Sequence, residues 1–171
     1  TDHCGCVLYI AECGASLELH VRGRRKRQMG VRDSLCTMGE VMPIEHAPFS
    51  MGEYDRRIAK TRKAMAEKGV DVLFITDPSN QAWLTGYDGW SFYVHQGVIL
   101  GMEGEPVWWG RTMDMFGGRR TCWMKDENVI GYGDHFIQST VYHPMQDLAE
   151  HLKSRGYGAA KVGVEMENYY Y

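Results

Sequence analysis

Several features that would assign a function at once are missing from this chain of 171 residues. It has no apolar run near the roughly 20 residues that cross a bilayer, and it does not begin with a secretory signal peptide. It has no basic excess, with 19 Lys and Arg against 22 Asp and Glu, whereas nucleic-acid-binding domains normally carry one. The sequence therefore predicts a cytoplasmic protein that binds neither membranes nor nucleic acids.

Cysteine is scarce and unevenly placed. Only five cysteines are present, and all except Cys122 lie in the first 36 residues. Cys4 and Cys6 are separated by one residue, which is short for a structural zinc site, and no signal peptide suggests a disulfide framework. A basic run at residues 22–27 is more typical of a solvated tail than of a recognition patch. Because residues 1–41 also lack a sustained helical or strand period, we predict that they form an unstructured or non-native leader.

A single domain is predicted over residues 42–171, beginning with a long helix. Ser50, followed three residues later by Glu53, predicts a capping box at the helix start, and Phe49 with Tyr54 predicts the accompanying apolar contact. Gly69 is expected to end the helix. Its apolar stripe is predicted to face inward, and its basic side chains, Arg57 among them, are predicted to lie mostly outward.

The remainder alternates between strand and helix patterns. Strands are predicted at residues 70–76, 91–100, 107–109, 128–132 and 161–166. Helical segments are predicted at residues 80–86, 112–123 and 143–155. The turn at residues 103–106 predicts an antiparallel hairpin. The fold class is therefore α/β, with a mixed β-sheet flanked by helices.

No recognisable reactive constellation is present. The chain has no phosphate-binding loop, no zinc-protease helix and no nucleophile elbow. Asp134, His135 and His143 are metal-ligand types, but their spacing fits neither one helical face nor one strand face. Cys122 has no base partner nearby in sequence, so a buried, inert thiol is predicted. We therefore predict no catalytic residue and no metal ligand in this chain.

The densest feature is an aromatic stretch over residues 83–96. If it is a strand, alternation places Trp90 with Phe92 on one face and Tyr93 with His95 on the other. The aromatic side chains of this stretch can simply pack in the core of a hairpin. The stretch can also line a ligand cleft, with Asp88 in the preceding loop. The residues alone leave both interpretations open.

Four motifs resemble the N-terminal domain of the creatinase, prolidase and aminopeptidase P family. They are EYDRRI at 53–58, KGVDVL at 68–73, DPSN at 77–80 and LTGY at 84–87. Two further tracts, GYDGWSFY at 86–93 and VGVEMENYY at 162–170, are most similar to the ectoine hydrolase branch. The resemblance covers the chain from about residue 50 to its end.

The resemblance implies a two-domain parent enzyme whose C-terminal "pita-bread" domain carries the reaction. In peptidase members that domain holds two metal ions, so a divalent metal is expected there and no cofactor in this chain. Ectoine hydrolases open the cyclic amidine of ectoine to N-acetyl-diaminobutyrate. Family members are commonly homodimers in which a loop of one N-terminal domain reaches the neighbour's active site. By motif position the substrate-binding residues of that loop are Asp88, Trp90, Phe92, Tyr93 and His95.

Creatinase itself is disfavoured as the parent. Phe92 matches a substrate-holding phenylalanine of its loop, but Val94 stands where creatinase has an arginine. Another arginine could supply the positive charge that Val94 lacks. The candidates are Arg111, Arg119 and Arg120.

Alternative functions remain. The parent could be an Xaa-Pro peptidase or a lyase acting on a small zwitterion. The chain could also be a complete, non-enzymatic interaction module that docks through the tyrosines at 169–171. Because these tyrosines follow the last predicted strand with nothing to cover them, we expect instead that the chain is truncated before a catalytic domain.

Overall fold

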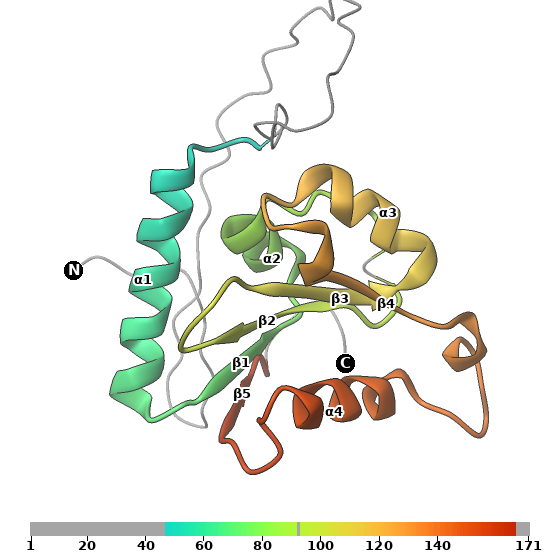
Figure 1. The fold of residues 1–171 in the computed structure, drawn as a ribbon. Helices are drawn as coiled ribbons and strands as arrows, with labels where there is room; N and C mark the ends of the chain where they lie inside the picture. The colour runs from blue at the N-terminus through green and yellow to red at the C-terminus, as the bar shows by residue number, and fades with distance from the viewer. Residues whose placement is uncertain (1–46, 92, 167–171) are drawn as a thin grey trace, which may run out of the picture.

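A computed structural model of the chain describes residues 47–91 and 93–166 (Figure 1). The elements in chain order are α1 (Met51–Lys68), β1 (Val72–Ile75), α2 (Pro78–Thr85), β2 (Gly97–Gly101), β3 (Val107–Arg111), α3 (Thr112–Thr121), β4 (Val129–Tyr132), α4 (Pro144–Ser154) and β5 (Val162–Val164). Short 3-10 turns, η1 (Asp126–Asn128) and η2 (Asp134–Phe136), flank β4. The predictions for residues 1–41, for Phe92 and for the tyrosines at 169–171 lie outside the described residues.

The strands form one five-stranded mixed sheet in the order β4-β3-β2-β1-β5. β2 pairs antiparallel with both β1 and β3, which confirms the predicted hairpin. The outer pairs, β1 with β5 and β3 with β4, are parallel. The crossover from β3 to β4 is made by α3, and the predicted mixed sheet flanked by helices is confirmed.

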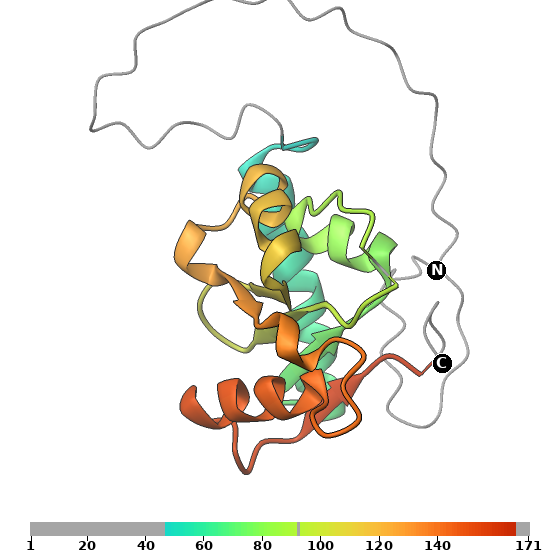
Figure 2. The same ribbon diagram turned by 90° about the vertical axis from the view of Figure 1, so that its right-hand side faces the viewer.

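Helices cover both faces of the sheet (Figures 1 and 2). On one face, α1, α2 and α3 pack against the sheet around Ile58, Leu84 and Trp108. On the other face, α4 packs through Leu148 against a cluster that includes Trp109. The Trp109 indole N–H also donates a 2.7 Å hydrogen bond to the Asp147 carboxylate, which fixes α4 to β3. The core is thus split into two layers by the sheet.

The start of α1 departs from the predicted capping box. The Ser50 side chain makes no capping hydrogen bond. Glu53 instead accepts 2.8 Å hydrogen bonds from Arg56 and Arg57, which lower the pKa of its carboxyl to about 2. Two cationic donors one turn ahead therefore outcompete the backbone N–H group for this carboxylate. The predicted contact between the Phe49 and Tyr54 rings is confirmed, with centroids 6.0 Å apart.

Arg57 is buried rather than outward, being 6% exposed. Its guanidinium donates to Glu53 and to the Trp83 carbonyl oxygen, at 2.8 and 2.9 Å. It also lies 3.9 Å from the centroid of the Phe49 ring, close enough for a cation–π interaction. Arg57 therefore links α1 to α2, because its charge is neutralised and its donors find partners inside the fold.

The strand predicted at residues 91–100 begins later than its sequence pattern indicates. β2 starts at Gly97, and the described residues just before it, 90, 91 and 93–96, form no strand. β5 is likewise shorter than predicted, spanning Val162–Val164. Trp90, Tyr93 and His95 therefore belong to a loop, and their assignment to strand faces was wrong.

Candidate functional site

The loop that joins α2 to β2, residues 87–96, carries all the residues predicted to contact substrate; we call it the aromatic loop. It begins where Gly86 ends α2 in the left-handed conformation, with φ of 78°. A side chain at this position would also collide with Tyr54, since a Cβ would lie 2.7 Å from the Tyr54 hydroxyl. Glycine is therefore needed both for the backbone turn and for the close approach to α1.

A buried polar cluster closes the base of the aromatic loop. Gln96 Oε1 accepts hydrogen bonds from the Ser91 hydroxyl at 2.9 Å and from the Tyr87 hydroxyl at 3.1 Å. All three residues are at most 5% exposed. Burial raises the pKa of Tyr87 to about 12, so its phenol stays protonated at neutral pH. Because the bonds span nine residues of sequence, they hold the two ends of the loop together.

Above this cluster the aromatic loop presents large side chains to the surface. Trp90 is 80% exposed and Tyr93 is 66% exposed. Asp88 is also exposed, and its backbone N–H donates to the Thr121 hydroxyl at the end of α3. Tyr93 lies within electrostatic range of Arg111, the last residue of β3. The structure thus brings Asp88, Trp90 and Tyr93 onto one solvent-facing loop that runs alongside α3.

His95, which is also exposed, packs beside the start of α4. Its ring packs edge to face with the His143 ring, with centroids 4.7 Å apart. Its carbonyl oxygen accepts a 2.7 Å hydrogen bond from the Tyr132 hydroxyl. Partial desolvation, followed by the nearby His143, lowers the pKa of His95. His95 is therefore held by contacts with β4 and with the N-cap of α4.

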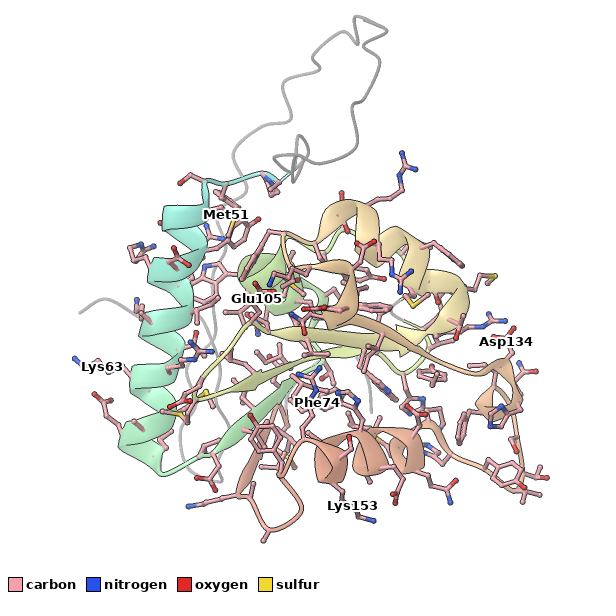
Figure 3. The ribbon with its side chains drawn as sticks, viewed as in Figure 1. Met51, Lys63, Phe74, Glu105, Asp134 and Lys153 are labelled. Atoms are coloured by element: carbon pink, nitrogen blue, oxygen red, sulfur yellow. The ribbon has the colours of Figure 1, made fainter. Side chains whose placement is uncertain are left out.

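A cavity of about 210 Å³ opens beside His95, where β1 and β5 end. Its lining consists of Phe74, Thr76, His95, Gln96, Met145, Val164 and Glu165. The Glu165 carboxylate accepts hydrogen bonds from the backbone N–H groups of Thr76 and Asp77, at 2.6 and 2.7 Å, and from the Asn80 side chain at 2.6 Å. These bonds connect β5 to the first turn of α2, the helix that leads into the aromatic loop. Figure 3 labels Phe74, the residue of β1 that lines this cavity.

Sequence reasoning missed the residues that support the site. Ser91, which was given no role, is buried, whereas Tyr93 is exposed. Gln96 and Glu165 were also assigned no role of their own, although each accepts several hydrogen bonds. The signal in the sequence is a polar residue immediately next to an apolar strand. This signal does not predict which distant donors will form hydrogen bonds with that residue.

The residues considered as metal ligands are engaged separately. Asp134 binds the Arg111 guanidinium at 2.7 Å, and His143 accepts a hydrogen bond from the Met145 backbone N–H as the N-cap of α4. Within residues 47–91 and 93–166, no three His, Cys, Asp or Glu residues are grouped so that they could hold a metal ion. Cys122 is buried as predicted, and burial raises the pKa of its thiol to about 12.

The arginines suggested as replacements for the creatinase arginine are arranged differently. Arg111 is already paired with Asp134, whereas Arg119 and Arg120 are exposed in the last turn of α3.

Among the described residues, no helix is both long and apolar enough to span a membrane.

The surroundings of His95 predict a pH-dependent stability. Partial desolvation, followed by the nearby His143, lowers the pKa of His95. The unfolded chain therefore binds the His95 proton more readily than the folded chain does. This contribution to stability is present above the ordinary histidine pKa and is lost as the pH falls toward the lowered value. We expect the free energy of unfolding to fall between pH 7.5 and 5 because of this group.

The variant His95→Asn tests this expectation, because asparagine does not titrate. Urea unfolding at both pH values should show a smaller pH-dependent loss of stability in His95→Asn than in the wild type. His135→Asn, which replaces an exposed histidine of η2, is the matched control. An unchanged pH dependence in His95→Asn would show that protonation of His95 does not control the stability.

The chain is similar to a known domain family and to proteins that contain this domain. Residues 57–171 match the creatinase/prolidase N-terminal domain. Over 125 residues the chain is 58% identical to the ectoine hydrolase of Halomonas elongata, covering 72% of this chain and 31% of that protein. It is 38% identical over 124 residues to an uncharacterized hydrolase/peptidase of Sinorhizobium fredii, covering 72% and 32% of the two chains. The chain therefore spans about a third of the length of these relatives.

Solved structures of similar fold include the creatinase-type domain of a dipeptidase from Streptococcus thermophilus. That domain is 16% identical, with a TM-score of 0.46, and the match covers 63% of this chain and 89% of that one. The family match itself extends over more than half of the present sequence, through every strand and the aromatic loop. The chain belongs to the creatinase/prolidase N-terminal domain family.

Proposed function

We propose that this chain is the N-terminal, substrate-contacting domain of a hydrolase that opens the cyclic amidine of ectoine to N-acetyl-diaminobutyrate. The observation that carries the proposal is the 58% identity to an ectoine hydrolase over 125 residues. The parent is proposed to be a cytoplasmic homodimer whose second domain supplies the catalytic groups and any divalent metal.

The chemistry of the aromatic loop suits a small cation with delocalised charge. The faces of tryptophan and tyrosine attract cations, and Trp90 and Tyr93 are 80% and 66% exposed. Asp88, exposed on the same loop, adds a negative charge. A protonated amidine presents a planar cation of this kind. The loop would bind and orient such a substrate, while the buried Tyr87, Ser91 and Gln96 cluster keeps the loop in place.

A chimeric enzyme tests the proposal directly. The segment of the Halomonas elongata ectoine hydrolase that matches this chain is replaced by residues 47–171, and ectoine consumption is measured. The chimera is expected to hydrolyse ectoine, and the 171-residue chain alone, with divalent metals added, is expected not to. Turnover of an Xaa-Pro dipeptide without turnover of ectoine would favour the peptidase alternative. Ectoine hydrolysis by the isolated chain would contradict its assignment as a supporting domain.

Within this chimera, Trp90→Ala and Tyr93→Ala are each expected to lower kcat/KM for ectoine by about tenfold, because substrate orientation is lost. The matched control is Met102→Ala, which truncates an exposed apolar side chain in the β2–β3 turn. Thermal unfolding should be nearly unchanged in all three variants, since each side chain is exposed. Wild-type kinetics in both loop variants would place substrate recognition elsewhere. Phe92→Ala, at the position matched to the creatinase phenylalanine, is proposed to behave like the other loop variants.

A further inference from the structure

A second cavity lies at the opposite end of β2 from the aromatic loop. β2 starts beside that loop at Gly97 and ends at Gly101, which lines the cavity. The walls come from the β2–β3 turn and from the segment that joins α4 to β5, and the volume is about 240 Å³. Six of the lining residues decide its chemistry, namely Ile99, Glu103, Glu105, Val107, Arg155 and Tyr157. We call it the turn cavity.

The floor of the turn cavity is apolar. Ile99 and Val107 stand opposite each other on β2 and β3, and they are 3% and 2% exposed. The Tyr157 ring packs against the same core cluster. The Tyr157 hydroxyl lies so close to Gly101 that a Cβ at this glycine would be 2.1 Å away. Glycine therefore leaves room for the hydroxyl, and the strand residues offer a surface to a small apolar group.

Groups of both charge signs line the turn cavity without being paired to one another. Glu103 and Glu105 lie in the β2–β3 turn, and Arg155 follows α4 as its C-cap. The ion pairs of residues 47–91 and 93–166 do not include Arg155 with either glutamate. The hydrogen bonds that Glu105 accepts from Lys125 and Asn128 both reach its Oε2, which leaves Oε1 for another donor.

Arg62, on α1, completes the charge balance around the turn cavity. It donates hydrogen bonds to two backbone carbonyl oxygens, at the end of β2 and in the turn that follows. It also lies within electrostatic range of Glu103. Because Arg62 offsets Glu103, one carboxylate and one guanidinium remain for a ligand, those of Glu105 and Arg155. This pair favours a molecule that carries both signs of charge and no net charge.

We propose that the turn cavity binds a small zwitterion, an α-amino acid with a short neutral side chain. The ligand carboxylate pairs with the Arg155 guanidinium, whose planar fork can donate two parallel hydrogen bonds to it. The ligand ammonium pairs with Glu105, and the side chain lies on the apolar floor. A volume of about 240 Å³ exceeds the roughly 150 Å³ that hold benzene and is below the roughly 300 Å³ of the smallest drug-sized pockets. The inference does not depend on the function proposed above.

The test is a titration of the 171-residue chain with L-valine, followed through the backbone amide signals in NMR spectra. Saturable shifts are expected at residues 101–107 and 155–157 but not at residues 87–91, with a Kd in the millimolar range. Two probes of matched shape each lack one charge: 3-methylbutanoate has no ammonium, and isobutylamine has no carboxylate. Each should bind at least about tenfold more weakly than L-valine, because one charged partner is left unmatched.

Two variants test the assigned pairs. Arg155→Gln and Glu105→Gln should each raise the Kd for L-valine by at least about tenfold. The matched controls are Arg119→Gln and Glu127→Gln, which change exposed residues outside the cavity and should leave the Kd unchanged. Circular dichroism checks that each variant remains folded.

The absence of saturable binding by the wild type would overturn the proposal. So would shifts confined to the aromatic loop, or an unchanged Kd in Arg155→Gln. Equal affinities for L-valine and for the two single-charge probes would show that the cavity does not recognise a zwitterion.

Discussion

Glu165→Ala is expected to lower the free energy of unfolding by about 3 kcal/mol, or roughly 10 °C in Tm. Its carboxylate accepts hydrogen bonds from Thr76, Asp77 and Asn80, all within 2.7 Å. Burial raises the pKa of Glu165, while these bonds oppose that shift by favouring its charged form. Alanine would leave these three partly buried N–H donors without their acceptor. A desolvated donor that has no hydrogen-bond partner lowers the stability of the folded state.

Glu165→Gln separates the loss of hydrogen bonds from the loss of side-chain volume. The glutamine oxygen can still accept from the backbone N–H groups, but its amide would meet the Asn80 side chain as a second donor. An intermediate loss of about 1 kcal/mol is expected. Glu103→Ala, in the exposed β2–β3 turn, is the matched control. The measurement is urea unfolding followed by tryptophan fluorescence. If Glu165→Ala and the wild type were equally stable, the hydrogen bonds between Glu165 and the start of α2 would contribute nothing to the free energy of unfolding.

Gly97→Ala is expected to destabilise the protein by about 2–3 kcal/mol. A Cβ at this position would lie 2.5 Å from Phe74 Cε2 and 2.6 Å from the Ile75 carbonyl oxygen. The Phe74 ring is packed in the core, and the carbonyl belongs to the neighbouring strand β1, so neither can move aside without disturbing the sheet. Since Gly97 follows Gln96 directly, the strain would also reach the cluster that closes the aromatic loop.

The matched control for this change is Gly52→Ala, in the first turn of α1, where a Cβ would meet nothing within 4 Å. Because alanine favours helix more than glycine does, Gly52→Ala should be neutral or stabilising by up to about 1 kcal/mol. Denaturation of both variants gives the comparison. If Gly97→Ala were as stable as Gly52→Ala, the close approach of β2 to Phe74 and Ile75 would have to be wrong.

Local sequence was sufficient for the elements whose signals do not depend on distant partners. The helix ended by Gly69 is found at Met51–Lys68, and the apolar run after it forms β1. The turn at residues 103–106 joins an antiparallel pair, and Pro144 stands in the first turn of α4. Each signal arises within a few residues, from side-chain periodicity, a fixed φ angle or a glycine that tolerates the left-handed conformation.

Local sequence failed where a side chain had to choose between near and distant partners. Ser50 and Glu53 have the pattern of a capping box, but Glu53 binds Arg56 and Arg57. Residues 91–96 alternate in sequence like a strand, but the Ser91 and Tyr87 hydroxyls donate hydrogen bonds to Gln96, and no strand begins before Gly97 in the described residues. In both places a tertiary or side-chain interaction is stronger than the local preference that the pattern reflects.

The sequence by itself determined the family and the fold class, because these rest on residue types and their order. Only the tertiary structure decided which described loop residues reach the surface, that His95 packs against His143, and that Glu165 joins β5 to α2. The reason is physical: a residue's neighbours across the sheet lie tens of positions away in the chain, and no local pattern encodes them.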